Sequence, residues 1–273
     1  MSEALDRLGL AFVARHPESA AAALETLDPA EAAGFLATVP AKEAATLLTQ
    51  TTPAIAQAFL AHLSAECIGE IVNEMSIAAG VATLRLLNPD ERALALQQFE
   101  GVRRKALARL LHFSQDTVGA IMDPLYPACS ADLAVASLGE RLQASPSKDF
   151  TCVFVLDRAQ CPVGVVRTHD VFLSDPGQSV SAIAAPCDYR IHGTTDWRSV
   201  AGNPDLRRWD ALPVVDDENR YIGALREDAV MRQAGDSEAI RAGGSWRRTS
   251  LALGEVFRLG LAGMLETIEN PKD

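Results

Sequence analysis

The chain has 273 residues, of which 48% are hydrophobic and only 5% aromatic, so it is long enough to bury a core in each of two domains. Its 36 acidic residues outnumber its 25 lysines and arginines, which gives a net charge of −11. That charge argues against nucleic-acid binding, which needs clustered cations facing phosphate, and it suits a surface that attracts cations.

The start of the chain, Met1 to Ala4, lacks a basic segment followed by a long apolar core. We therefore expect no secretory signal and a cytoplasmic protein. Five cysteines are scattered without a C-x-x-C pair: Cys67, Cys129, Cys152, Cys161 and Cys187. We interpret them as reduced thiols that act as small hydrophobes, with a disulfide between Cys152 and Cys161 as the alternative.

From about Asp6 to Leu111 the sequence predicts a series of short helices. Apolar residues recur at helical spacing, as at Phe35, Leu36 and Val39. Helices of two or three turns are not stable alone, so we expect them to stack as a superhelix of unassigned handedness. Breaks recur every 11 to 13 residues, mostly at a proline that suits a first helical turn, and lie at Asp28-Pro29, Val39-Pro40, Thr52-Pro53, Leu63-Ser64, Met75-Ser76 and Asn88-Pro89.

Two similar segments follow a joint at Phe113–Tyr126. In each, a β-branched run leads through a polar turn to a second apolar run, which predicts a β-hairpin. Seven residues separate an aspartate from a glycine in both copies, Asp157 from Gly164 and Asp216 from Gly223. Predicted helices precede the hairpins, at Ala131–Ala144 and Asp196–Trp209, and short helices follow them. A helix–strand–strand–helix unit that occurs twice predicts two halves about a pseudo-two-fold axis.

The doubled hairpin resembles a pair of cystathionine-β-synthase (CBS) domains, which often bind adenine nucleotides between their halves. The joint, with its run from Phe113 through Gly119 to Asp123, is similar to the segment that precedes the CBS pair in MgtE-type magnesium channels. The resemblance covers roughly residues 15–233 and implies an α+β multi-domain fold. Its parts are a superhelical domain of short α-helices (1–115), a CBS pair (122–234, with halves 122–186 and 187–234) and a tail with an amphipathic helix (235–273).

The resemblance also implies Mg²⁺ held by carboxylates of both domains. Here alanines, including Ala78 and Ala79, occupy a helix opening where the family carries several aspartates, so we expect any site to be weak. Glu66, Glu70 and Glu74 lie at helical spacing, and a solvated helix face is their alternative interpretation. For Asp90 and Glu91 the alternative interpretation is that they are acidic residues in the first turn of a helix, where they interact favourably with the helix dipole. The candidate metal ligands are Glu70, Glu74, Asp90, Glu91, Asp228 and Asp236.

Nucleotide-binding CBS domains resemble one another in a Ser/Thr-x-x-Asp sequence after the hairpin, whose aspartate holds the ribose hydroxyls. The first copy has Arg167 in place of the hydroxyl residue and retains Asp170. In the second copy Ala229 takes the aspartate position, and Asp228 lies one residue, or about 100°, away on a helix. We expect one weak nucleotide site, at Arg167 and Asp170, although an Arg–Asp ion pair explains these residues equally well. We interpret His169 as a surface or capping residue.

The tail departs from the family. Thr249–Ile268 predicts an amphipathic helix interrupted by Glu255 and Arg258, too charged to span a membrane. It is our candidate for contact with a partner, such as a membrane transporter.

The pattern favours a regulatory module that responds to Mg²⁺ or an adenine nucleotide and acts through another protein. A structural interaction scaffold with decayed ligand sites is the alternative. No catalytic triad, P-loop or dinucleotide-binding glycine pattern is present, so we expect no enzyme. We expect a homodimer through the CBS pair, with Phe172, Leu173, Val230 and Met231 in the contact.

Overall fold

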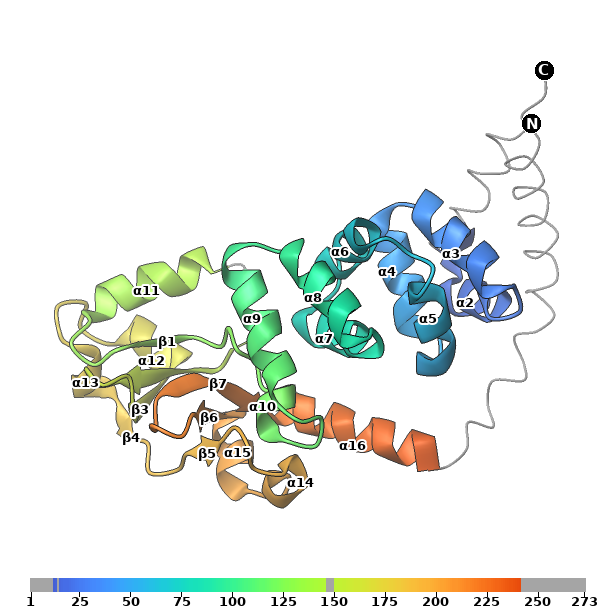
Figure 1. Ribbon diagram of the computed structural model, residues 1–273. Coiled ribbons are helices and arrows are strands. Elements are labelled where there is room, and N and C mark those ends of the chain that lie inside the picture. Colours follow the sequence, from blue (N-terminus) through green and yellow to red (C-terminus); the bar gives the residue numbers. More distant parts are fainter. Residues whose placement is uncertain (1–11, 14, 146–149, 242–273) are drawn as a thin grey trace. The chain divides into compact units, whose positions relative to one another are not determined.

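A computed structural model describes residues 12–13, 15–145 and 150–241, without the side chains of 235–241. The chain divides into two compact units, one running to Ala108 and the other from Arg109 to Arg241 (Figure 1). A helical unit followed by a unit of strands and helices confirms the predicted α+β class. The predicted helix at 249–268 lies outside the described residues.

Short helices make up the first unit, and each predicted break coincides with a helix start. The start residues carry caps: the side chains of Asp28, Ser64 and Ser76 accept hydrogen bonds from backbone N–H groups of the first turn, which satisfies donors that a helix leaves unpaired. The helices are α2 (Pro17–Leu24), α3 (Pro29–Thr38), α4 (Ala41–Gln50), α5 (Pro53–Leu60), α6 (Ala65–Asn73), α7 (Ile77–Leu86), α8 (Pro89–Gln97) and α9 (Gly101–His112).

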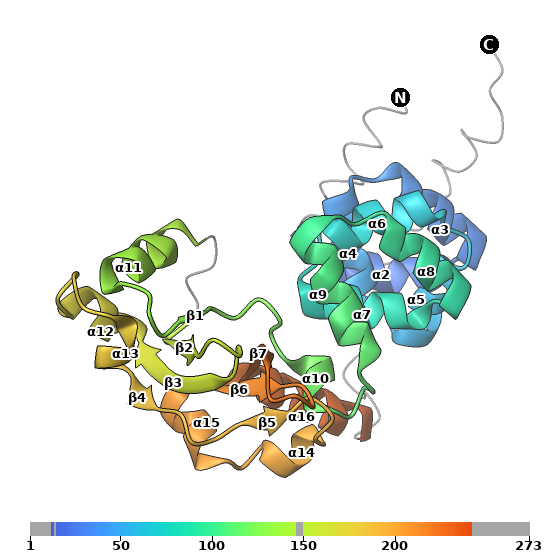
Figure 2. The ribbon, with the colours of Figure 1, turned by 60° about the vertical axis from the view of Figure 1, so that its left-hand side comes forward.

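In the series from α2 to α8 the helices pack mainly on the next but one: α2 on α4, α3 on α5, α4 on α6, α5 on α7 and α6 on α8. Fully buried alanines at the contacts, such as Ala20, Ala32 and Ala44, allow the helix axes to approach closely. Figure 2 shows the short helices wound around a common axis. The predicted superhelical stack is confirmed.

The second unit contains two sheets of the same design. In each, a parallel strand precedes an antiparallel hairpin, and the orders are β1-β2-β3-β4 and β5-β6-β7. The strands are β1 (Ala128–Ser130), β2 (Cys152–Leu156), β3 (Pro162–Arg167), β4 (Ala185–Pro186), β5 (Ile191–His192), β6 (Ala211–Val215) and β7 (Tyr221–Arg226). The helices are α10 (Val118–Ile121), α11 (Val135–Ala144), α12 (Thr168–Leu173), α13 (Val180–Ile183), α14 (Trp197–Val200), α15 (Pro204–Trp209) and α16 (Glu227–Arg241).

The two hairpins have the same strand register. Val155 pairs with Gly164 in the first, and Val214 pairs with Gly223 in the second, each followed by an irregularity before the turn. The turns match as well, because the carboxylate of the aspartate that ends each first strand accepts two backbone hydrogen bonds. Gln160 and Asn219, one near the end of each turn, have positive φ values of 67° and 62°. The fixed Asp-to-Gly spacing therefore encodes one turn, made twice.

A shared core joins the two halves of this unit. Phe154 of the first hairpin lies 5.7 Å from the Tyr126 ring and 5.8 Å from the Tyr221 ring, centroid to centroid. Buried residues of both hairpins, including Val165 and Ala224, belong to the same cluster. The sheets therefore pack on each other as the pseudo-two-fold arrangement requires.

The joint is anchored by Phe113. A Cβ atom on Gly119 or Gly193 would fall 2.4 Å or 2.6 Å from the Phe113 ring, so only glycine fits at either position. Backbone hydrogen bonds from Val118 and Gly119 to the segment at 193–195 fix the joint beside β5.

Two predicted helices differ from the structure. The segment Asp196–Trp209 is not one helix but α14 and α15, because Asn203 caps a new helix and Pro204 occupies its first position. The helix predicted from Ala131 begins only at Val135, since Ala131 and Leu133 hydrogen-bond to the segment at 180–181 instead. Both disagreements concern where a helix begins or ends, which depends on capping residues and on tertiary hydrogen bonds.

Candidate functional site

The ends of the two hairpins present equivalent positions. In the first, the N–H of Thr168 donates to the carbonyl of Thr151 at 2.9 Å, and in the second, the N–H of Glu227 donates to the carbonyl of Asp210 at 3.0 Å. Arg167 and Arg226 therefore occupy the same place, each at the end of a strand and directly before a helix. The repeat creates two related sites within this unit.

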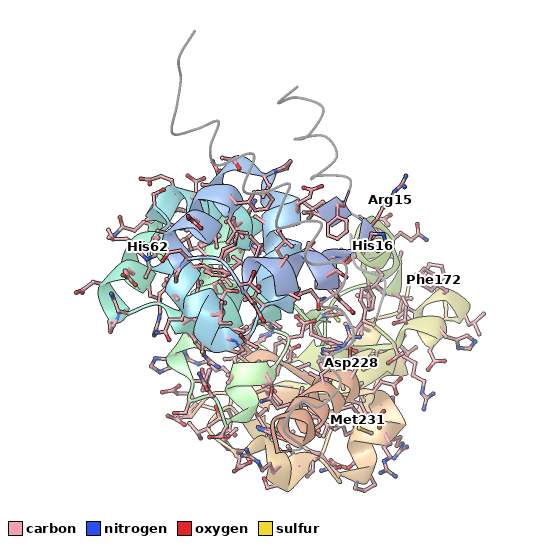
Figure 3. The ribbon with its side chains drawn as sticks, turned by 90° about the vertical axis from the view of Figure 1, so that its right-hand side faces the viewer. Arg15, His16, His62, Phe172, Asp228 and Met231 are labelled. Atoms are coloured by element: carbon pink, nitrogen blue, oxygen red, sulfur yellow. The ribbon has the colours of Figure 1, made fainter. Side chains whose placement is uncertain are left out.

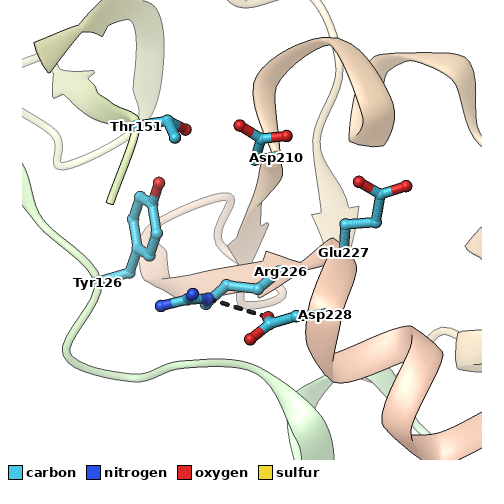
Figure 4. A pocket seen from close by; sticks show the side chains of 6 residues that line it. All are labelled: Tyr126, Thr151, Asp210, Arg226, Glu227 and Asp228. Carbon is cyan, nitrogen blue, oxygen red and sulfur yellow. Dashed lines mark hydrogen bonds and ion pairs between the residues drawn. The ribbon is translucent and has the colours of Figure 1, made fainter. Parts of the chain in front are cut away.

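A pocket of about 260 Å³ lies at the second of these sites. Figure 4 shows Tyr126 and Thr151 of the first half facing Asp210 and Glu227 of the second, with the Arg226 side chain extending between them toward Tyr126. Both halves contribute to it, as expected for a cleft at a pseudo-two-fold axis. The lining residues are Tyr126, Thr151, Asp210, Arg226, Glu227 and Asp228.

Charge in this pocket is mostly negative. Three carboxylates line it against one guanidinium, Arg226, whose Nε already donates to Asp228 at 3.0 Å. Arg232 also donates to Asp228, at 2.8 Å. Burial alone would raise the pKa of Asp228, but the hydrogen bonds and charges of Arg232 and Arg226 outweigh burial and lower it. Asp228 is therefore ionised and engaged by two arginines.

The Tyr126 side chain, which lines the pocket, is itself largely buried. The Tyr126 hydroxyl lies 3.4 Å from the thiol of Cys152, and Tyr126 is 5% exposed. Burial raises the pKa of both groups, that of Cys152 to about 11, so neither ionises near neutral pH. Neither the Tyr126 hydroxyl nor the Cys152 thiol therefore acts as a nucleophile or a base near neutral pH.

The first site has the opposite character. The guanidinium groups of Arg167 and Arg208 lie 5.1 and 5.2 Å from the centroid of the Trp209 ring, within cation–π range. Asp170 does not pair with Arg167 in the described structure; its carboxylate lies 3.1 Å from Nδ1 of His169, and both side chains are largely exposed. Positive charge and an aromatic face therefore meet beside Arg167.

The residues that we named as metal ligands do not gather in the described structure. Glu70, Glu74 and Asp90 are exposed on α6 and α8, and the Glu91 carboxylate accepts from the N–H of Asn88 in a capping box. Asp228 is held by arginines, and the side chain of Asp236 lies outside the described part. Within that part, no three His, Cys, Asp or Glu side chains lie close enough to hold a metal ion. The metal assignment stays a prediction.

Three of the four residues named for the dimer contact are solvent-facing. Phe172, Leu173 and Met231 are 52%, 73% and 61% exposed, and Figure 3 shows Phe172 and Met231 at the surface of this unit. Val230 is 3% exposed, so its assignment to the contact was wrong. Val230 points about 100° away from its neighbour Met231 around the axis of α16, so the two side chains lie on different faces of the helix.

Sequence reasoning missed Trp209, Tyr126 and Thr151. Each lies well outside the Arg167–Asp170 segment, and the fold brings them to the hairpin ends. One signal was available, because Thr151 and Asp210 occupy equivalent positions in the repeat, 59 residues apart.

Comparison with known proteins agrees with the division of the chain into a helical unit and a second unit of strands and helices. Residues 15–116 match the family model of the MgtE intracellular N domain. Two curated relatives, magnesium transporters MgtE of Thermus thermophilus and Enterococcus faecalis, are each 27% identical over 130 and 137 residues. These stretches cover 47% and 49% of this chain but 29% and 30% of the relatives, so the match spans less than a third of either transporter.

Solved structures show the same fold across both units. The cytosolic domain of the Mg²⁺ channel MgtE in complex with ATP matches with a TM-score of 0.63 and 22% identity, over 85% of this chain and 100% of that one. The soluble part of a magnesium transporter matches with a TM-score of 0.59 and 20% identity, over 87% and 99%. The chain thus resembles the cytosolic region of MgtE-type transporters, which confirms the resemblance seen in the joint and the doubled hairpin. Among the described residues, no helix has both the length and the apolar character to cross a bilayer.

Proposed function

We propose that this chain is a cytoplasmic regulatory module, not an enzyme, that responds to an adenine nucleotide or Mg²⁺ and acts through a partner protein. The observation that carries the proposal is the pair of equivalent hairpin ends, each with an arginine directly before a helix. At the second of them, residues of both halves line a pocket. A relative of the same fold is described in complex with ATP, and it is a domain of a channel.

The nucleotide binds at the first site, beside Arg167 and Asp170. Phosphate is attracted by guanidinium groups, and two of them, Arg167 and Arg208, lie against Trp209. Both guanidinium groups lie over the Trp209 ring, so a base that stacks on this ring displaces one of them. Asp170 is exposed to accept ribose hydroxyls. At the second site three carboxylates oppose a triphosphate, and Ala229 stands where the ribose aspartate is expected.

Isothermal titration with ATP and with AMP tests this assignment. We expect one weak site per chain that Asp170→Ala or Arg167→Ala removes and that the matched change Arg226→Ala at the second site leaves intact. Two equivalent sites per chain, or binding that Asp170→Ala does not weaken, would show that the ligand does not use the first site.

Any Mg²⁺ response draws on the remaining acids, Glu70, Glu74, Asp90 and Glu91 together with Asp228 and Asp236. Because alanines replace acids at one helix opening and arginines already neutralise Asp228, we propose that the affinity is millimolar or weaker. The module forms a homodimer through Phe172, Leu173 and Met231, three large apolar side chains that are each more than half exposed.

The second candidate is a structural scaffold without a ligand. Two observations favour a scaffold. Asp170 is exposed and pairs with His169, and the helix openings contain few acidic residues. A thermal-shift series with Mg²⁺, ATP and AMP separates the two. A ligand at about 100 times its dissociation constant adds about 2.7 kcal/mol of stability, whereas a scaffold responds to none of the three.

A further inference from the structure

Helix α9 carries a concentration of positive charge that is unusual for this acidic chain. Its sequence contains four lysines and arginines, ends in His112 and includes no acid. Arg103 turns inward, where its guanidinium donates to the carbonyls of Val72 and Met75. Arg104, Lys105, Arg109 and His112 are exposed and, at helical spacing, follow one face. Of these, Arg109 donates to the carbonyl of Ile222 at 2.8 Å, which leaves Arg104 and Lys105 as the cations open to a partner.

Helix α6 carries the complementary charge. Glu66, Glu70 and Glu74 are exposed, four residues apart, on the face opposite the buried Ile68, Ile71 and Val72. Within the described part of the chain, no ion pair engages Glu66, Glu70, Arg104 or Lys105. Both stripes therefore meet solvent with unneutralised charge.

The two stripes match in length as well as in sign. Glu66 to Glu74 and Arg104 to His112 each cover nine residues, or about 12 Å between the first and last Cα along a helix that rises about 1.5 Å per residue. Both lie on the same chain, so two copies related by a two-fold axis can form the same contact twice.

We propose that the basic face of α9, through Arg104 and Lys105, docks on the acidic face of α6, through Glu66 and Glu70, of a second copy of this chain. This contact is separate from the CBS-pair contact proposed above and uses neither Phe172 nor Leu173. A second copy fits better than an anionic membrane because the chain itself supplies a carboxylate stripe of the right length, and Val102 is the one large apolar residue exposed on α9 among the described residues.

Sedimentation equilibrium of the full chain tests the contact in a Leu173→Asp background, without Mg²⁺ and at low salt. The background removes the proposed CBS contact, so any remaining association reports on the helical unit. We expect a dimer that weakens at high salt. Arg104→Glu with Lys105→Glu, or Glu66→Lys with Glu70→Lys, raises the dissociation constant at least about tenfold, because like charges then face each other in both symmetric contacts.

The decisive arm mixes the two variants in equal amounts. In the mixed dimer one contact is native and the other has both signs exchanged, so association returns to the parent level. The control for the α9 variant is Lys42→Glu with Arg207→Glu, which lowers the net charge by the same amount at exposed positions elsewhere and leaves the dimer intact.

A parent that stays monomeric, a control as disruptive as the α9 variant, or a folded mixture that fails to associate would each overturn the proposal. Since Arg104→Glu and Lys105→Glu leave every candidate metal and nucleotide residue in place, a failed Mg²⁺ or nucleotide response has no bearing on this result.

Discussion

Gly223 shows how a single residue determines the geometry of the second hairpin. A Cβ atom at this position would lie 2.7 Å from the carbonyl oxygen of Asp123 and 3.0 Å from Cα of Pro124. Both are backbone atoms, so the clash cannot be relieved by a side-chain rotation. Asp123 and Ala224 exchange backbone hydrogen bonds at this crossing, which ties the joint to β7.

We expect Gly223→Ala to destabilise the second unit by about 1–3 kcal/mol, the range for forced overpacking. Chemical denaturation measures the loss. Gly202→Ala is the control, because nothing lies within 4 Å of a Cβ atom there. Equal effects of the two changes would show that the close approach at Gly223 is easily relaxed.

Thiol chemistry also varies from residue to residue. All five cysteines are free. Burial raises the pKa of Cys129 and Cys152 to about 11, so near pH 8 only about one thiol in a thousand is ionised at each. Cys161 lies in the hairpin turn and is only half-buried.

We therefore expect an alkylating reagent near neutral pH to modify Cys161 before Cys129 and Cys152, and to reach those two only when the chain opens. Peptide mass mapping against time gives the order, and labelling in denaturant, where all five thiols react, gives the reference. Early modification of Cys152 in the folded chain would contradict the buried geometry.

Among the helices, the end of α6 depends on a residue from α9. The guanidinium of Arg103 donates to the carbonyls of Val72 at 2.6 Å and of Met75 at 2.7 Å. These carbonyls lie at the C-terminal end of α6, where the helix dipole is negative, so a cation is a favoured donor. The Val72 carbonyl also accepts from the N–H of Met75, at 3.1 Å. Arg92 has a similar role at the end of α7, where it donates to the carbonyls of Leu84 and Leu87.

Arg103→Met preserves most of the aliphatic volume and removes both hydrogen bonds. We expect a loss of about 2 kcal/mol in the stability of the helical unit, since a hydrogen bond to a charged group contributes about 1.5–3 kcal/mol net of its exchange with water. Thermal denaturation measures it, with Arg207→Met, at an exposed position of α15, as the control. A difference below about 0.5 kcal/mol would mean that water replaces the guanidinium at little cost.

For the whole molecule, the proposed dimer makes the clearest prediction. Leu173 is 73% exposed and Phe172 is 52% exposed on α12. Leu173→Asp places a charge in an apolar contact, so we expect the CBS-mediated dimer to dissociate while the fold is kept. Light scattering at several protein concentrations gives the mass. Arg104→Glu and Lys105→Glu are included in the same chain, so that the contact between helical units does not contribute.

Magnesium supplies the second prediction at this scale. Carboxylates brought together without a cation repel by about 1 kcal/mol per pair at ~4 Å in water, and a bound divalent ion reverses that sign. Because few acids remain and Asp228 is already paired, we expect little compaction in small-angle scattering when Mg²⁺ is added at constant ionic strength. A clear decrease in the radius of gyration at low millimolar Mg²⁺ would show that the sensor is intact.

The sequence alone determined what local chemistry controls. Proline, serine and aspartate at the breaks specified where each short helix begins, since a cap or a fixed φ acts within one turn. The two aspartates of the hairpin turns specified the repeat for the same reason, because Asp157 and Asp216 bond to their own turns. Local hydrogen bonds need no knowledge of the rest of the chain.

Only the tertiary structure decided which distant residues share a site. Trp209 meets Arg167 across 42 positions of the sequence, and Tyr126 meets Arg226 across 100, because the strand register of the two hairpins brings their ends together. It also decided that Val230 is buried while Met231, its neighbour, is exposed. Such contacts depend on how sheets and helices pack, and a pattern of residue types along one chain does not contain that geometry.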